Sequence, residues 1–195
     1  MPKISAPTLS QQRQWRRSQL MDAAASIALE DGAHRVSVAT VATRAGLSRT
    51  SFYEYFASSS DIVAELITEE LESFSAFLEE KVRDVTEPIQ AISIWVSSSL
   101  EYVADGRHLL AKALSAIEIS RDQSAVIGMA HRKMLLSLSG PLAKLGVDDI
   151  AQALSLIHSA TQSATTRIES GADSAREIEN TRNFIVAGIS TLSRG

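Results

Sequence analysis

Apolar residues recur at helical spacing along almost the whole chain, and the pattern changes only at short polar breaks. Glycine follows several of the periodic segments, at Gly32, Gly46, Gly146 and Gly171, where it can end a helix in the left-handed conformation. Pro141 is expected to kink or restart one long segment. The pattern predicts helices over about 14–31, 38–44, 48–56, 59–82, 89–104, 108–119, 121–145, 148–169 and 174–192. Since no segment indicates a strand, we expect an all-α fold of about nine helices.

The stretch VSVATVATRAGLSRTSFYEYF, residues 36–56, contains two of the shortest predicted helices and a tight turn between them. Ser37 and Ser48 are natural N-caps for the two helices, because a serine oxygen can accept from a free N–H of the first turn. Gly46 can end the first helix. Phe52 and Phe56 lie four residues apart, so they share the buried face of the second helix. This pattern is typical of a helix-turn-helix motif, whose second helix enters the DNA major groove.

Residues 16–66 resemble the DNA-binding domain of the TetR family of bacterial transcriptional regulators. The family pattern is roughly S/T-V-x-x-V-A-x-x-A-G-V-S-x-x-T-F-Y-x-Y-F, and it is matched in register by Ser37, Val38, Val41, Ala42, Ala45, Gly46, Leu47, Ser48, Ser51, Phe52, Tyr53, Tyr55 and Phe56. Together with the helix pattern, the resemblance implies a three-helix DNA-binding domain over 14–57. A flexible basic arm over 1–13 precedes it, and a helical bundle for effector binding and dimerisation follows over 58–195.

The resemblance also implies a function and its partners. A protein of this kind is a homodimer that binds a palindromic double-stranded DNA operator and, as a repressor, releases it on binding a small molecule. The residues expected to contact DNA are Arg35, Ser37, Thr40, Ser48, Arg49, Thr50, Ser51, Tyr53, Tyr55 and Ser59. Among them, Arg49 suits the O6 and N7 atoms of guanine. Glu54 either accepts from a cytosine amino group or is a solvent-exposed charge.

One position departs from the family pattern. The family usually has a lysine at the position of Ser59, where it meets a phosphate at the start of a helix. A serine can donate a hydrogen bond there but carries no charge. We therefore expect DNA binding to be weaker or more tolerant of salt than is usual for the family.

Charge is distributed unevenly along the chain. The net charge is −4, but residues 1–60 carry seven basic and four acidic residues, whereas the other 135 carry twelve and nineteen. The excess of positive charge coincides with the predicted DNA-binding domain. Chance unevenness would look similar, so the charge supports the motif without establishing it. Arg16 and Arg17, near the start of the first helix, suggest an external anion such as a phosphate, or are simply solvated.

The C-terminal bundle is expected to supply an effector pocket and a dimer interface. Apolar walls with a few polar groups suit a small-molecule site, and the candidates are Phe74, Trp95, Tyr102, Met129, Met134, His158, Thr161 and Gln162. Each of them could equally be a packing residue. Small and aliphatic residues on the last two helices would form the dimer interface: Ala153, Ile157, Ala160, Ala164, Phe184, Ile185, Gly188 and Ile189. The same faces could instead form the core of one chain.

Other classes of protein find little support. Phosphate-cradling, zinc-protease and nucleophile-elbow motifs are missing, so we do not expect an enzyme or a cofactor. Four scattered histidines and no cysteine argue against a metal site. No run approaches the ~18 apolar residues of a membrane helix, and we expect a cytoplasmic protein. Two alternatives stay open: a DNA-binding protein without an effector, and an interaction module that uses the same fold without DNA.

Overall fold

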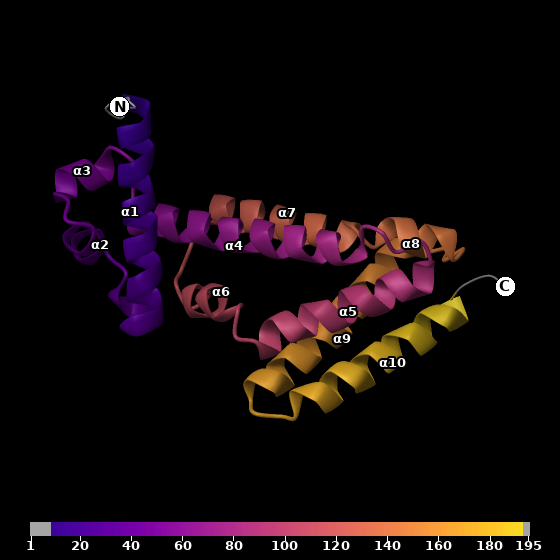
Figure 1. Ribbon diagram of the computed structural model, residues 1–195. Helices are drawn as coiled ribbons and strands as arrows, with labels where there is room; N and C mark the ends of the chain where they lie inside the picture. Colours follow the sequence, from indigo (N-terminus) through magenta and orange to yellow (C-terminus); the bar gives the residue numbers. More distant parts are fainter. Residues whose placement is uncertain (1–8, 193–195) are drawn as a thin grey trace, which may run out of the picture. The chain divides into compact units, whose positions relative to one another are not determined.

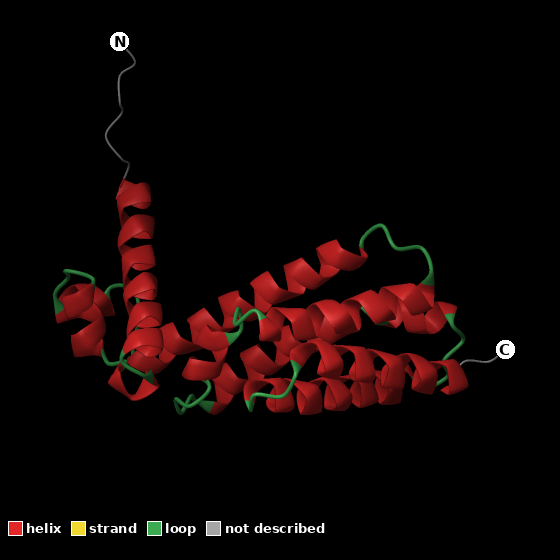
Figure 2. Ribbon diagram, turned by 60° about the horizontal axis from the view of Figure 1, so that its bottom comes forward, coloured by secondary structure: helices red, strands yellow, loops and turns green. Residues whose placement is uncertain are grey.

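The computed structural model describes residues 9–192, and every regular element among them is a helix (Figure 2). The expected all-α class is therefore confirmed for the described part of the chain. It contains ten α-helices, labelled in Figure 1, and one short 3-10 helix, η1. Their bounds are α1 Leu9–Glu30, η1 Ala33–Arg35, α2 Val38–Arg44, α3 Arg49–Tyr53, α4 Ser59–Val82, α5 Pro88–Ala104, α6 Leu109–Leu114, α7 Arg121–Leu136, α8 Ser139–Lys144, α9 Ile150–Glu169 and α10 Ser174–Leu192.

The helices form two compact units. The first unit contains the described residues up to Glu69 together with Leu110–Val126, and the second contains Glu70–Leu109 and the described residues from Ile127 onward. Helices α4 and α7 therefore contribute to both units. The division lies twelve residues beyond the expected domain end at 57, because the start of α4 belongs to the first unit. Within that unit, Gln123 Nε2 of α7 donates a 2.6 Å hydrogen bond to Asp61 Oδ1 of α4.

The core of the first unit lies where α1 packs against α2 and α2 packs against α3. Phe52 is completely buried and Phe56 is 4% exposed, which confirms their expected place in the core. The turn between α2 and α3 requires Gly46, whose φ of +68° is costly for a residue with a Cβ. The N–H of Leu47 closes this turn with a 2.9 Å bond to the carbonyl of Ala42. The sequence pattern of residues 36–56 is thus a folded helix-turn-helix.

The core of the second unit is formed by α5, which packs against both α9 and α10 (Figure 1). Trp95 of α5 is 1% exposed and is the largest completely buried side chain. Its indole Nε1 donates a 3.1 Å hydrogen bond to Ser137 Oγ, which in turn donates to the carbonyl of Met134. A buried indole needs such a partner, because an unpaired N–H in the interior is costly.

Several helix boundaries differ from the sequence-based expectation. The helix expected over 108–119 is shorter, because α6 ends at Leu114, and the one expected over 48–56 ends at Tyr53. Helix α1 begins at Leu9 instead of about residue 14, so the expected arm over 1–13 is helical from residue 9, and its first eight residues lie outside the described part. Glutamine and arginine favour a helix even without an apolar stripe, which explains the longer α1. The expected helix over 121–145 is two helices, because α7 ends at Leu136 and Pro141 lies in the first turn of α8. That separation raises the expected nine helices to ten.

Candidate nucleic-acid interface

The N-terminus of α2 is closed by hydrogen bonds between Ser37 and Thr40. Ser37 Oγ accepts from the Thr40 N–H at 3.2 Å, and Thr40 Oγ1 accepts from the Ser37 N–H at 3.0 Å. The Thr40 hydroxyl also donates to the carbonyl of Arg35 at 2.6 Å, which leaves the Ser37 hydroxyl as the donor between the two side chains, 2.9 Å apart. Both hydroxyl protons are thus used within the protein. Ser37 and Thr40 are expected to contact DNA, and a hydrogen bond donated to DNA by either hydroxyl would require this cap to rearrange.

Helix α3 is the second helix of the motif and presents most of the expected base-reading residues. Ser48 Oγ accepts from the Ser51 N–H at 3.0 Å and donates to Ser51 Oγ, so it caps the helix as expected. Arg49 and Thr50 are exposed at the start of the helix, and Tyr53 is 57% exposed near its end. The cap from Ser48 therefore supports a short helix whose polar face is open to solvent.

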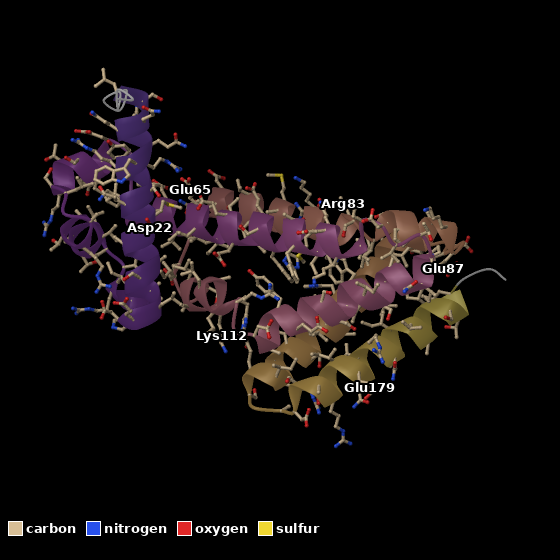
Figure 3. The ribbon with its side chains drawn as sticks, viewed as in Figure 1. Asp22, Glu65, Arg83, Glu87, Lys112 and Glu179 are labelled. Carbon is tan, nitrogen blue, oxygen red and sulfur yellow. The ribbon has the colours of Figure 1, made fainter. Side chains whose placement is uncertain are left out.

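Two arginines of the first unit are bound to carboxylates. Arg44 at the end of α2 donates to Glu30 Oε2 at 2.8 Å and to Asp31 Oδ2 at 2.6 Å, which ties α2 to the end of α1. Arg17 of α1 forms an ion pair with Glu65 of α4, labelled in Figure 3, and its guanidinium lies over the ring of Phe56. Arg17 is therefore an internal partner and is a weaker candidate for an external anion than the sequence suggested.

The remaining expected contacts lie around these helices. Arg35 is exposed in η1, and Tyr55 is half-buried just after α3. Ser59 is the first residue of α4 and is half-buried, while the cap of that helix comes from Ser58, whose Oγ accepts from the Asp61 N–H at 3.1 Å. The expected DNA contacts thus lie on η1, the starts of α2, α3 and α4, and the residues that follow α3.

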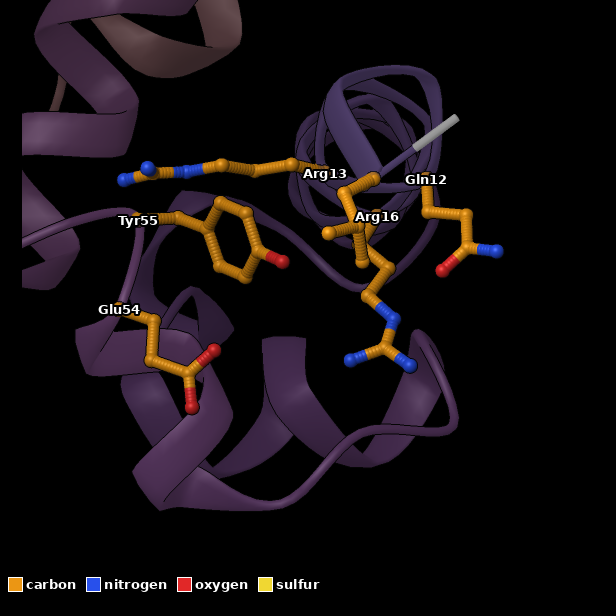
Figure 4. Close-up of a pocket in the computed structure, with 6 residues that line it drawn as sticks. Gln12, Arg13, Arg16, Glu54 and Tyr55 are labelled. Carbon is orange, nitrogen blue, oxygen red and sulfur yellow. The ribbon is translucent and has the colours of Figure 1, made fainter. Parts of the chain in front are cut away.

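An open hollow that the sequence did not reveal lies between the start of α1 and the end of α3 (Figure 4). It has a volume of about 570 Å³ and is lined by Leu9, Gln12, Arg13, Arg16, Glu54 and Tyr55. Arg13 extends beside Tyr55, with its guanidinium carbon 5.9 Å from the centre of the ring (Figure 4). Glu54 thus lines the same hollow as two arginines. In the sequence, the segment QQRQWRR (residues 11–17), which contains no acidic residue, is the feature that could have indicated this hollow.

The expected effector residues do not gather in one cavity of the second unit. Trp95 and Met134 are buried in its core, and the Thr161 hydroxyl donates to carbonyl oxygens of its own helix. Met129 is 55% exposed and Gln162 also faces solvent. Their role as pocket residues therefore stays a prediction.

Two of the expected effector residues, Phe74 and Tyr102, stack with their ring centres 4.5 Å apart. Phe77 adds a third ring, 5.5 Å from Tyr102, and the guanidinium carbon of Arg107 lies 4.4 Å from the centres of both of these rings. Burial and then the charge of Glu70 raise the pKa of Tyr102, while Arg107 acts in the opposite direction. The cluster joins α4 to the end of α5.

His158, another expected effector residue, contacts a histidine of α7. Its Nδ1 lies 3.3 Å from Nε2 of His131, and the rings meet edge to face with centres 4.7 Å apart. Burial, and then the charge of His158, lower the pKa of His131 below the ordinary value of 6.5. The pair connects α7 to α9 and favours a neutral His131.

The expected dimer residues divide between two surfaces of α9 and α10. Five of them lie in the core of the second unit: Ala153, Ile157, Ala164, Ile185 and Ile189. Phe184 is 72% exposed, Gly188 is also exposed, and Ala160 is half-buried. Leu156, which the sequence-based set omitted, is 54% exposed on α9. An apolar outer face and a buried inner face are therefore both present on this helix pair.

A groove of about 350 Å³ lies on the α9–α10 pair, with Phe184 and Ala160 in its lining. At one end of the pair, Glu177 accepts from Arg167 Nε at 2.9 Å and from Nη2 at 2.7 Å. This fork-shaped hydrogen bond and the charge of Glu177 raise the pKa of Arg167. The ion pair fixes the end of α9 to the start of α10.

Two negative observations apply to residues 9–192. None of the described helices is long and apolar enough to cross a membrane. Within the same range, no group of three or more histidine, aspartate or glutamate side chains could hold a metal ion.

An N-terminal helix-turn-helix unit joined to a helical body defines a class of DNA-binding regulators. The family described as "Bacterial regulatory proteins, tetR family" matches residues 20–66. Residues 20–66 therefore form a DNA-binding domain of the TetR family of bacterial transcriptional regulators.

A curated relative and two solved structures are similar to the chain. The "Fatty acid metabolism regulator protein" of Bacillus subtilis is 29% identical over 93 residues, which are 48% of this chain and 47% of that protein. The chain thus matches about half the length of this relative. The fatty acid degradation regulator FadR from Bacillus halodurans aligns over 95% of this chain and 98% of its own, with a TM-score of 0.72 and 19% identity. FadR from Bacillus subtilis in complex with stearoyl-CoA aligns over 88% and 98%, with a TM-score of 0.73 and 21% identity. Both structures share the fold.

The histidine pair predicts a loss of stability in mild acid. Because the pKa of His131 is lowered by folding, the folded state binds fewer protons than the unfolded state. The contribution of neutral His131 to the free energy of unfolding is complete above about pH 6.5, the pKa of histidine in the unfolded state. It is lost as the pH falls below this value and through the lower pKa of the folded state. We expect the free energy of unfolding in urea to be smaller at pH 5.5 than at pH 7.5, and the difference to shrink in His131→Gln.

The matched control is His34→Gln, which removes an exposed histidine of the first unit. It should retain the pH dependence of the wild type. If His131→Gln and the wild type lose the same free energy between the two pH values, the pair does not cause the dependence.

Proposed function

We propose that the protein is a dimeric transcriptional regulator that binds a palindromic DNA operator through α3 and releases it on binding a small molecule. The observation that carries the proposal is the exposed face of α3, where Arg49 and Thr50 stand on a helix whose other face is fixed by the buried Phe52. Hydrogen bonds from such side chains to base edges read sequence, whereas contacts to phosphates position the protein. The family of this DNA-binding domain supports the same function.

The dimer is proposed to form through the outer face of α9 and α10. Phe184 and Leu156 leave much of their apolar surface in solvent, and Ala160 and Gly188 are small enough to allow another helix to approach. The groove beside Phe184 offers space for a side chain of a second copy. A two-fold dimer would present two α3 helices to the two halves of a palindrome. The inner residues, such as Ile157 and Ile185, support this face by packing the helix pair.

The effector is proposed to be a long-chain acyl thioester that binds in the second unit. The support comes from the similar proteins: the curated relative is named for fatty acid metabolism, and the Bacillus subtilis structure contains stearoyl-CoA. Helix α4 is continuous from the first unit into the second, so a ligand that shifts it would bias the DNA-binding unit. The mechanism would be a population shift toward a conformer whose two α3 helices no longer match the operator. A DNA-binding protein without an effector is the alternative.

Substitutions on α3 test the recognition face. A palindrome is first selected by the wild-type protein from random duplexes, and dissociation constants are measured on it by fluorescence anisotropy. Arg49→Ala should weaken binding by about 1–3 kcal/mol per half-site if the guanidinium contacts a base. Tyr53→Phe should have a smaller effect, because it removes only a hydroxyl. Arg132→Ala, an exposed arginine of α7, is the control and should bind like the wild type. If neither α3 variant binds more weakly, the assigned face is incorrect.

A charge on the outer face of α10 tests the dimer. Phe184→Glu should raise the dissociation constant of the dimer by roughly 30-fold, or about 2 kcal/mol, as loss of a central interface side chain does. Sedimentation equilibrium gives this constant directly. Leu136→Glu makes the same change at a residue of α7 with 58% exposure and serves as the control. A wild-type monomer, or equal dissociation in the two variants, would reject this interface.

Stearoyl-CoA is the probe for the effector, added to protein that has been unfolded, stripped of ligand and refolded. Binding to the folded state should raise the thermal unfolding midpoint and, in the same concentration range, lower occupancy of the selected palindrome. Coenzyme A and stearate alone are the controls for the two parts of the molecule. A raised midpoint without release of DNA would reject the regulatory role. No effect on either quantity would favour the effector-free alternative.

A further inference from the structure

The first part of α1 is a helical segment without a place in the core. Every residue from Leu9 to Arg16 is exposed, and the completely buried residues of α1 begin only at Leu20. Trp15 is 62% exposed and Leu9 is 86% exposed. The eleven residues from Leu9 to Gln19 span about 16 Å at the rise of an α-helix. We call residues 9–19 the α1 arm. Because it buries so little apolar surface, packing does not explain its composition.

The α1 arm carries only positive charge. It contains Arg13, Arg16 and Arg17, and the first acidic residue of the helix is Asp22. Of the three arginines, only Arg17 forms an ion pair with a carboxylate in the described part of the chain, and its partner is Glu65. Two guanidinium groups are therefore left for an external anion.

Arg13 and Arg16 both line the hollow of about 570 Å³, and their guanidinium groups point to different sides of Tyr55 (Figure 4). Arg13 reaches it beside the ring of Tyr55, and Arg16 reaches it from the next turn of α1. Glu54 lines the hollow from the end of α3 and forms no ion pair with either arginine. Its carboxylate would repel a phosphate on the α3 side, so an anion fits on the side of α1.

The hollow adjoins the proposed recognition helix, because Glu54 and Tyr55 follow α3 directly. We propose that Arg13 and Arg16 of the α1 arm bind the DNA sugar-phosphate backbone while α3 occupies the neighbouring groove. The hydroxyl of Tyr55 can donate a hydrogen bond to the same backbone. This arrangement compensates for the uncharged Ser59 with cations from another helix. The inference rests on the proposed function.

Salt dependence measures the contacts directly. The logarithm of the binding constant falls with the logarithm of the salt concentration with a slope of about −0.9 for each phosphate that is neutralised. A dimer uses each arginine twice, so Arg13→Ala and Arg16→Ala should each reduce the size of the slope by about 1.8, and the double variant by about 3.6. Arg13→Lys and Arg16→Lys should keep the wild-type slope, since a phosphate contact needs charge but not the guanidinium fork.

Arg176→Ala is the matched control, because it removes one exposed arginine from α10 and changes the net charge equally. Its slope should equal that of the wild type. Hydroxyl-radical footprinting gives a second readout. The double alanine variant should lose protection of the sugars that the α1 arm contacts and keep protection of the sugars beside α3. Circular dichroism and the thermal unfolding midpoint establish that each variant is folded.

The outcomes separate this inference from the function on which it rests. If the wild type selects no palindrome, the proposed function fails. If the wild type binds and folded Arg13→Ala and Arg16→Ala variants show its slope and its footprint, the α1 arm does not contact DNA. A reduced slope in Arg176→Ala as well would show a general effect of net charge and would also overturn the inference.

Discussion

The proposed function depends on the burial of one side chain, Phe52. Helix α3 contains five residues, and a helix of that length is not stable alone because the cost of nucleation exceeds the gain from so few hydrogen bonds. Its conformation is imposed by the complete burial of Phe52, by the cap from Ser48 and by the turn at Gly46. The exposed side chains of α3 are ordered only because this inner face is fixed. A cavity at Phe52 would therefore disorder the reading face as well as the core.

Charge pairing within the first unit decides which cations can meet DNA. Arg44 and Arg17 are already bound to carboxylates, and each connects two helices of the unit. Arg49 stands on α3, and Arg13 and Arg16 line the hollow at its end without ion pairs among the described residues. Fewer cations of the N-terminal region are thus available to DNA than the seven basic residues of positions 1–60 suggest. The arginines of this region without an ion pair among the described residues lie on the α1 arm, on η1 and on α3.

The sequence predicted the first unit in more detail than the second because its constraints are local. Gly46, the two serine caps and the phenylalanines four residues apart each act within a few positions, so their consequences could be inferred from spacing alone. The longer α1 was missed because residues 9–13 have no apolar stripe, although glutamine and arginine favour a helix. The hollow beside Tyr55 was missed because it joins residues 9–16 to residues 54 and 55, which are distant in the sequence.

The second unit was harder because helical spacing identifies an apolar face but not its partner. Trp95 was a reasonable pocket candidate, yet it is a core residue bonded to Ser137 on a distant segment. Ile185 and Phe184 are neighbours in sequence, but one is buried in the chain and the other is exposed. Only the packing of α5 against α10 determines which of the two side chains is buried. Effector residues stay predictions for the same reason, since their positions depend on tertiary contacts.

Guanine methylation protection on the selected palindrome shows whether α3 reads the major groove. The N7 atom of guanine lies in the major groove and is the atom that dimethyl sulfate modifies. Binding of two α3 helices in the major groove should protect two clusters of N7 atoms, one in each half of the palindrome and about one helical turn apart, that is roughly 34–36 Å. Tight binding with every N7 atom still reactive would contradict this binding mode.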